Sequence, residues 1–278
     1  MPLTKAEGAG HLNLGTTVSA DDFDDLAIEG SEFSVLLLFD GDLERLLDGR
    51  FMDRLIDASP PIKYVHVQEF VNHDGDDVLV DLSSEDEPLR RRSVQIVAAT
   101  RSIAHDLHDS LVVFHPGGVR RTTVDRQMLL SNLEKSLREL SPSSLLMENL
   151  PWYYWYKKRE RFVSNICVSI EDMARFMNMV EGFTLDICHG YLSVPEGDPN
   201  YCTRFMDAFG GKVAHIHASD AKAPDKEGLQ IGEGDVDFSS LIDVDVPIIA
   251  EVWNGHANGG EGFRIAIERL RSLERLDD

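Results

Sequence analysis

The sequence predicts a single (β/α)₈ barrel, the TIM barrel architecture, over residues 1–278. Its length suits a one-domain α/β barrel with a filled interior. Short apolar, β-branched runs recur along the whole chain, and each is followed by a segment with helical spacing, which is the pattern of repeated βα units. Several of these runs are apolar at successive positions, which is typical of parallel strands covered on both faces.

Eight of these runs are predicted as strands. They comprise residues 11–16, 33–40, 63–70, 111–116, 144–150, 183–189, 212–220 and 247–253. Ser169 and Asp172 have the spacing of a capping box and predict the start of a helix. This helix is expected to run to about Glu181, with Gly182 as its stop. The last helix is expected to bury one apolar stripe, formed by Phe263, Ile267, Leu270 and Leu273.

The composition indicates an ordinary globular protein with a strongly acidic surface. Hydrophobic residues make up 42% of the chain and charged residues 27%. The formal net charge is −22, from 49 acidic and 27 basic residues. This charge repels phosphate backbones and therefore argues against a nucleic-acid partner without excluding it. Acidic, lysine-poor surfaces are also general in high-salt hosts, and we interpret the charge first in that way.

Two further features concern the compartment. The longest apolar run, residues 35–39, is too short to cross a bilayer, and the first ten residues contain no apolar leader segment. We therefore expect a cytoplasmic protein without membrane contact. Cys167, Cys188 and Cys202 are odd in number and lack CxxC spacing, so they are predicted to be reduced and mostly buried.

Nearly every predicted strand ends in a side chain that can bind a metal or move a proton, and active sites of such barrels are assembled at these ends. These side chains are His66, His115, Glu148, Asp186, His189, His215, His217 and Glu251. Any one alone is more often structural, as a hydrogen-bonded histidine or a helix-capping carboxylate. Burying Glu148, Asp186 and Glu251 near one axis is unfavourable unless a cation or protons neutralise them. Mixed carboxylate and imidazole ligands suit Mn²⁺, Zn²⁺, Co²⁺ or Fe²⁺ better than Ca²⁺.

Motifs from about residue 63 to the C-terminus resemble the xylose isomerase-like barrel superfamily, which contains endonuclease IV and many sugar or sugar phosphate isomerases and epimerases. The motifs are His66 with Asn72, His115-Pro-Gly-Gly, Glu148-Asn, Asp186-Ile-Cys-His189, His217-Ala-Ser-Asp220, Ile231-Gly-Glu-Gly234 and Glu251.

The resemblance implies a divalent metal cofactor, with one or two ions per chain. The central ion would be held by Glu148, Asp186, His217 and Glu251. In the endonuclease-like branch, the positions of His66 and His115 bind a second ion, which the first glutamate bridges. His215 is the rival ligand on its strand, and we prefer His217 because His-x-x-Asp matches the family pattern.

Three departures from the nuclease pattern favour a small-molecule substrate. The nuclease places an Asp-x-His pair shortly before the Gly-Glu-Gly turn, whereas residues 225–230 contain no histidine, which puts a complete three-ion site in doubt. Residues 19–25 are acidic where a phosphate track would need Arg or Lys. Glu69 stands where the nuclease places an aromatic wedge.

An aromatic segment, residues 151–156, follows the strand that carries Glu148. Aromatic rings stack on sugars or bases, and the adjacent cations could hold a phosphate or carboxylate. Trp152 and Lys157 are therefore candidates for substrate binding. Packing over the barrel rim or an oligomer contact explains the segment equally well.

The leading functional hypothesis is a metal-dependent isomerase or epimerase of a sugar, sugar phosphate or related polyol. Glu148 and Glu251 would be the catalytic base and acid beside a Lewis-acidic ion. His189 would bind a substrate hydroxyl or orient Asp186, and His215 is a further candidate for substrate contact. The alternatives are an endonuclease IV-like hydrolase acting at abasic DNA, another metal-dependent lyase or hydrolase, and a non-catalytic sugar or metal sensor. The resemblance also implies a homo-oligomer.

Overall fold

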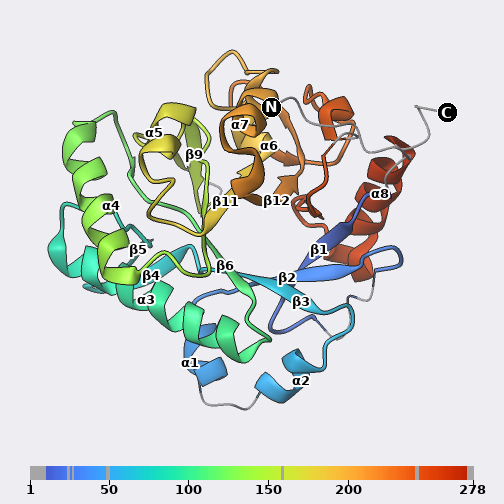
Figure 1. The fold of residues 1–278 in the computed structure, drawn as a ribbon, viewed down its shortest axis with the longest axis horizontal. Helices are drawn as coiled ribbons and strands as arrows, with labels where there is room; N and C mark the ends of the chain where they lie inside the picture. Colours follow the sequence, from blue (N-terminus) through green and yellow to red (C-terminus); the bar gives the residue numbers. More distant parts are fainter. Residues whose placement is uncertain are drawn as a thin grey trace.

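The computed structural model describes residues 11–23, 26, 28–47, 51–157, 160–241 and 244–273. Parallel strands form a closed barrel in the order β1-β15-β12-β11-β8-β6-β3-β2 (Figure 1). The strands are β1 (Leu14–Ser19), β2 (Phe33–Leu37), β3 (Ile62–His66), β6 (Leu111–Phe114), β8 (Leu145–Glu148), β11 (Gly182–Asp186), β12 (Val213–Ala218) and β15 (Ile248–Ala250). The predicted barrel is confirmed, and each predicted strand contributes one barrel strand.

The helices lie around the barrel, with α3 and α4 on one side and α8 on the other (Figure 1). They are α1 (Asp42–Leu47), α2 (Met52–Ile56), α3 (Glu87–Asp106), α4 (Arg126–Leu140), α5 (Ile170–Arg175), α6 (Ile187–Tyr191), α7 (Tyr201–Phe209) and α8 (Ala257–Leu273), with short 3₁₀ turns at Gly210–Lys212 and Phe238–Leu241. The predicted stripe on α8 is confirmed, because Phe263, Ile267 and Leu270 are buried and Leu273 packs against the same core.

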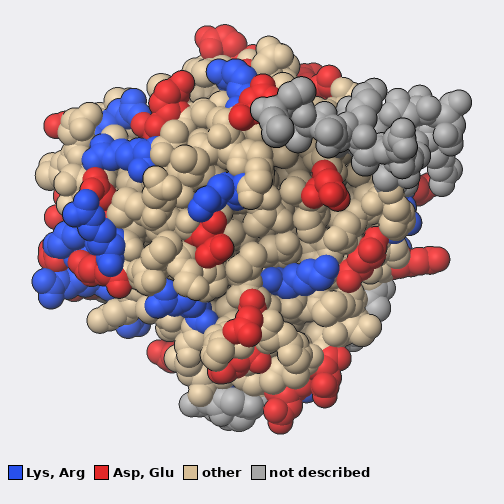
Figure 2. Space-filling model, viewed as in Figure 1, with Lys and Arg blue, Asp and Glu red and all other residues tan. Residues whose placement is uncertain are grey.

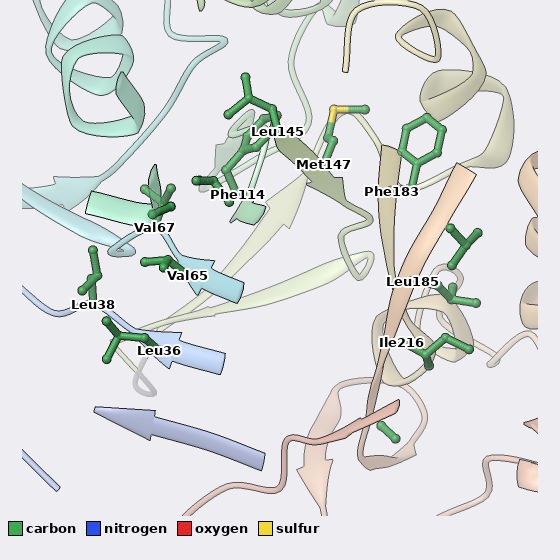
Figure 3. Close-up of a cluster of buried hydrophobic side chains, with 14 of the residues drawn as sticks. Leu36, Leu38, Val65, Val67, Phe114, Leu145, Met147, Phe183, Leu185 and Ile216 are labelled. Carbon is green, nitrogen blue, oxygen red and sulfur yellow. The ribbon is translucent and has the colours of Figure 1, made fainter. Parts of the chain in front are cut away.

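Alternate side chains of the strands enter two different cores, because successive strand residues point to opposite faces. One core lies between the strands and the helices and includes Leu36, Val65, Phe114, Met147, Leu185 and Ile216 (Figure 3). The other joins strands from opposite sides of the ring and fills the barrel interior. It consists of Phe33, Val35, Tyr64, Val113, Leu146 and Ile249.

Two local predictions around residues 169–189 were wrong. The hydroxyl of Ser169 caps α5 by accepting the backbone N–H of Asp172, as expected, but α5 ends at Arg175 rather than near Glu181. Gly182 begins β11 instead of stopping a helix. An added Cβ there would lie 2.4 Å from the carbonyl oxygen of Lys212, so the close pairing of β11 with β12 requires glycine.

The segments that follow several barrel strands form small sheets at the rim, which the sequence did not reveal. The hairpin β4–β5 (Phe70–His73 and Asp76–Leu79) follows β3, and the hairpin β13–β14 (Asp220–Lys222 and Lys226–Leu229) follows β12. A third sheet pairs β7 (Val119–Arg120), β10 (Glu160–Ser164) and β9 (Tyr153–Tyr156). The aromatic segment after β8 is therefore largely a β-strand.

The surface carries charges of both signs. Basic side chains gather over α3 and α4, next to acidic ones, on the face shown in Figure 2. Among the described residues, no helix is long and apolar enough to span a membrane. Cys167 and Cys188 are buried and Cys202 is partly buried, and all three are unpaired, as predicted.

Candidate metal centre

The alternation along the barrel strands brings metal-capable side chains to one point. His66, Glu148 and Asp186 are the last residues of β3, β8 and β11. Tyr64 and Leu146, two positions earlier on their strands, belong to the core inside the barrel. His66 and Glu148 therefore point inward as well, one layer nearer the mouth.

Three further barrel strands, β6, β12 and β15, bring side chains to the same place. His115 and Glu251 come directly after β6 and β15, two positions beyond the inward-facing Val113 and Ile249. His217 lies on β12 in full burial. The predicted convergence of imidazoles and carboxylates is therefore present in the structure.

Glu148 lies at the middle of this group, with a side chain that is only 1% exposed. Its Oε2 lies 3.4 Å from His66 Nε2 and 3.3 Å from His217 Nδ1. Its Oε1 lies 3.2 Å from His115 Nε2 and 3.3 Å from His189 Nδ1. One carboxylate thus contacts four imidazoles that come from different parts of the chain.

Two more carboxylates complete the centre. Glu251 Oε2 lies 2.7 Å from His217 Nδ1, and Asp186 Oδ2 lies 3.6 Å from His189 Nδ1. The potential ligand atoms fall into three groups, in each of which all atoms lie within 4.8 Å of one another. The groups are His66/His115/Glu148, Glu148/Asp186/His189 and Asp186/His217/Glu251. Since Glu148 and Asp186 are each shared by two groups, the centre could hold more than one ion.

His189 is placed by the start of α6 rather than by a strand, which corrects the predicted strand over residues 183–189. Asp186 is the N-cap of α6 and accepts the backbone N–H of His189 at 2.7 Å. The side chain of Asn149 bonds the backbone N–H and C=O of Asp186, each at 2.9 Å. His189 Nδ1 lies 3.0 Å from the carbonyl oxygen of Asn149. Asn149 of the Glu-Asn motif thus fixes the backbone of Asp186 and contacts the ring of His189, both from the Asp-x-x-His motif.

His217 and His215 occupy different depths on β12. His217 presents Nδ1 to Glu148 and Glu251, while its Nε2 lies 3.0 Å from His215 Nε2. The ring of His215 is fully buried below, with its centroid 4.0 Å from that of Tyr64. This geometry favours His217 over His215 as a ligand and gives His215 contact with His217 rather than with the open mouth.

Asp220, the last residue of the His-x-x-Asp motif, has a structural role. Its buried carboxylate accepts backbone N–H groups of Gly232 and Gly234 at 2.8 Å and of Val236 at 3.0 Å. A Cβ at Gly234 would lie 2.2 Å from the carbonyl oxygen of Ala221, so the turn requires glycine there. These contacts hold the loop after β12 against the barrel.

The described ionic partners of the three central carboxylates are imidazoles. Burial alone would raise the pKa of Glu148, but His217 and His115 hold that pKa well below its ordinary value. Burial raises the pKa of Asp186 to about 6. Burial also favours the neutral ring of His217, yet Glu251 and Glu148 raise its pKa well above the usual range. Protonated imidazoles therefore neutralise the buried acids when a cation does not.

The donor set fits a divalent transition-metal ion. Glu148 Oε2 and His217 Nδ1 are buried 3.3 Å apart, and neither makes a hydrogen bond of good geometry, although Glu251 Oε2 lies 2.7 Å from His217 Nδ1. Buried polar atoms are rarely left so, and an ion between them would satisfy both. Asp186, His217 and Glu251 form one group that could hold an ion, and His66, His115 and Glu148 form another, while the expected part of Glu148 in the central site stays a prediction.

Glu227 on β14 is a residue of the centre that the sequence did not single out. Its Oε2 is buried without a hydrogen-bond partner and lies 3.9 Å from His189 Nε2. Burial raises the pKa of Glu227 to about 7. The stretch before the Gly-Glu-Gly turn lacks a histidine, but its glutamate still reaches the centre. The signal was the Asp225-x-Glu spacing in that stretch.

The aromatic segment also reaches the centre, through a different residue from those proposed. Tyr154 is buried, donates its hydroxyl to Glu69 Oε1 at 3.0 Å, and has its ring centroid 6.0 Å from that of His115. Trp152 packs partly buried on the rim cluster that includes Tyr154. Lys157 Nζ forms an ion pair with Asp77 at 3.1 Å. Substrate contact by Trp152 or Lys157 stays a prediction.

The chain belongs to the xylose isomerase-like TIM barrel family, whose sequence profile matches residues 64–273. An uncharacterized protein of Methanocaldococcus jannaschii is 27% identical over 170 residues, which cover 58% of this chain and 60% of that protein. A probable endonuclease 4 of Aquifex aeolicus is 24% identical over 184 residues, covering 63% of this chain and 60% of that protein. The chain thus spans about 60% of the length of these curated relatives.

Solved structures share the fold at low sequence identity. A D-tagatose 3-epimerase-like protein is 20% identical with a TM-score of 0.62, covering 95% of this chain and 100% of that one. Endonuclease IV from Thermus thermophilus is 17% identical with a TM-score of 0.63, covering 94% of this chain and 99% of that one. Epimerases and a nuclease are therefore about equally similar in fold.

Proposed function

We propose that this protein is a divalent-metal-dependent isomerase or epimerase of a small sugar-type molecule, either a sugar, a sugar phosphate or a related polyol. The observation that carries the proposal is that two glutamates approach one imidazole nitrogen from different strands. Glu148 from β8 and Glu251 from β15 lie 3.3 Å and 2.7 Å from His217 Nδ1. Paired carboxylates beside one position can remove a proton and return it.

The roles follow from exposure and contacts. A bound ion would act as a Lewis acid that polarises substrate oxygens and acidifies the neighbouring C–H. The side chain of Glu251 is 26% exposed, so it can reach a substrate at the mouth and exchange a proton with it. Glu148, whose side chain is buried, would serve from deeper in the barrel. Asp186 orients His189 through the first turn of α6, and His189 can donate to a substrate hydroxyl.

The test is a panel of aldoses, ketoses and their phosphates, assayed with metal-loaded protein at high and low salt. Glu251→Gln should retain the fold and lose turnover by at least about a hundredfold, because the amide cannot accept the proton. Glu233→Gln is the matched control, since that side chain is 59% exposed at the surface. Full turnover in Glu251→Gln would overturn the assignment, and an ion-binding protein inert toward the whole panel would favour a sensor.

A second candidate is phosphodiester hydrolysis at abasic DNA, because the His66/His115/Glu148 group could hold a second ion. Two ions can activate a water and stabilise the leaving oxygen of a phosphodiester. Elemental analysis combined with cleavage of an abasic-site oligonucleotide separates the candidates. Two or more ions per chain together with specific cleavage would favour the hydrolase, whereas an inert oligonucleotide and a reacting sugar would favour the isomerase.

A further inference from the structure

The hairpin formed by β9 and β10, here called the strap, reaches two rim hairpins on opposite sides of the barrel. It follows β8 in the chain and contacts both the β4–β5 hairpin and the turn between β13 and β14. These two hairpins follow β3 and β12, which lie four strands apart in the closed order β12-β11-β8-β6-β3. In a ring of eight strands, that separation is the full diameter. Since the adjacent residues Trp155 and Tyr156 contact the two hairpins, the hairpins converge on the strap over the mouth.

On the β4–β5 side, the strap is fastened by polar and aromatic contacts. The hydroxyl of Tyr156 donates to the backbone carbonyl of Asp77, and Lys157 Nζ lies 3.1 Å from the carboxylate of the same residue. The ring of Tyr156 meets that of Phe70 edge-on, with centroids 5.6 Å apart. One residue of the rim hairpin thus receives two contacts from the strap.

On the β13–β14 side, the strap is fastened in a similar way. The indole N–H of Trp155 donates to the backbone carbonyl of Asp225 at 2.7 Å. Arg161, which pairs with Trp155 across the strap, lies 2.8 Å from the carboxylate of Asp225. Neighbouring residues of β9 therefore point to opposite sides of the mouth, as the alternation along a strand requires.

Beneath these contacts, the strap carries Tyr154 toward the metal centre. Tyr154 lies against His115 and, with Gln68 and Glu69, lines a pocket beside the centre. Lys157 and Arg161 are each paired with a carboxylate of the rim, so a phosphate backbone would have to compete with Asp77 and Asp225 for them. A polymer would have to displace the strap from both rim hairpins to reach the centre, whereas a small molecule would need a smaller opening.

We propose that the strap is the specificity element of this protein: fastened across the mouth, it admits small molecules to the metal centre and excludes polymers, duplex DNA included. The proposal rests on the proposed function in that it assumes a substrate-binding ion centre below the strap. It adds that ligand size is selected by the contacts of Trp155 and Tyr156 with the rim.

The test measures access to the centre with chelators of two sizes. Protein loaded with Mn²⁺ is exposed to free nitrilotriacetate or to the same group coupled to a soluble dextran. In the wild-type protein, the free chelator should remove the ion faster than the coupled one. The double variant Trp155→Phe/Tyr156→Phe loses the indole and phenol hydrogen bonds to the rim and keeps the ion pairs of Lys157 and Arg161, so the coupled chelator should act about tenfold faster than on the wild type. Tyr153→Phe, which removes a hydroxyl from the same strand that makes neither rim contact, is the matched control and should behave as wild type.

Equal rates for both chelators on the wild-type protein would overturn the proposal, as would a folded double variant with unchanged rates. Hydrogen exchange of the strap amides provides a measurement that needs no ion. Exchange over residues 153–156 should be faster in the double variant than in Tyr153→Phe, and equal exchange would contradict the proposal. Failure of the protein to retain any ion would contradict the proposed function alone. The hydrogen-exchange experiment would still decide whether the contacts of Trp155 and Tyr156 hold the strap closed.

Discussion

The metal centre and the strap lie at the same mouth, yet they are built in different ways. The centre consists of buried side chains at strand ends, where Glu148 and His217 are held by the hydrogen-bonded barrel itself. The strap is paired with the short strand β7 through its backbone, but its contacts with the two rim hairpins are a few side-chain contacts, and the Lys157–Asp77 ion pair among them is nearly half exposed. If the strap opens while the barrel stays closed, a substrate can enter without displacing the side chains that would coordinate an ion.

The largest effect is expected in the barrel wall that supports the centre. Phe183 on β11 is fully buried against Phe209 and Phe205, with ring centroids 4.6 Å and 6.0 Å away. Phe183→Ala should lower the free energy of unfolding by about 4 kcal/mol, because it leaves a cavity behind the strand of Asp186. Urea unfolding of the metal-free protein measures this. Phe183→Leu should cost much less, and equal costs for the two variants would show that the wall does not depend on this packing.

Removal of the bridging charge should act on ion binding more than on the fold. Glu148→Gln keeps the size of the side chain but removes the carboxylate that faces His66, His115 and His217. We expect the affinity for Zn²⁺ or Mn²⁺ to fall by at least about a hundredfold. Isothermal titration at about pH 8 measures the loss. The strap variant Tyr156→Phe should bind the ion at equilibrium as tightly as the wild type. An equal loss of affinity in both variants would show that the strap supports ion binding as much as the centre does.

The charge balance of the centre predicts a pH dependence. Burial favours neutral rings, but Asp186 raises the pKa of His189 to about 10, and Glu251 raises that of His217 well above its ordinary value. In the unfolded chain both rings lose their protons at about pH 6.5. Between these pH values the folded metal-free protein therefore binds more protons than the unfolded chain. Its free energy of unfolding should fall as the pH rises from about 7 toward 10.

A bound ion replaces those protons, so the rise in Tm caused by Mn²⁺ should grow over the same window. Thermal unfolding with the ion or with a chelator, at several pH values, measures both trends. A metal-induced gain that shrinks as the pH rises would show that protonated histidines are not what the ion displaces.

The smallest effects on stability are expected in the strap. Tyr156→Phe removes one hydrogen bond to the rim and should lower the Tm by about 2 °C. Lys157→Ala removes an exposed ion pair, and we expect no resolvable change in Tm. Thermal unfolding in low salt checks both. A large loss of stability in either variant would mean that the strap is part of the folding core rather than a cover.

The fold and most of the centre could be predicted because both follow from the two-residue period of the strands. Val113 and His115, or Leu146 and Glu148, are separated by one outward residue, so the inward direction of the second residue follows from the first. The closure of the barrel then brings such residues together from distant parts of the chain. The unfavourable burial of several acids supplied the reason to expect a cation.

The parts of the centre that the sequence did not predict depend on contacts between distant segments, which leave no local sequence pattern. His189 was assigned to a strand, because the helix that places it is only one turn long and begins at its own capping residue, Asp186. Glu227 and Tyr154 reach the centre because hairpins after β12 and β8 fold back over the mouth. The direction of those hairpins is set by contacts between distant loops, such as that of Trp155 with Asp225, which have no periodic signature.

The most direct measurement is anomalous diffraction from crystals soaked with Mn²⁺ or Zn²⁺ at about pH 8, where fewer protons compete for the ligands. An anomalous peak is predicted at coordination distance from Glu148, Asp186, His217 and Glu251, about 2.0–2.2 Å for Zn²⁺. The contradicting result is a crystal that takes up the ion only at surface carboxylates, while these acids stay paired with protonated histidines alone.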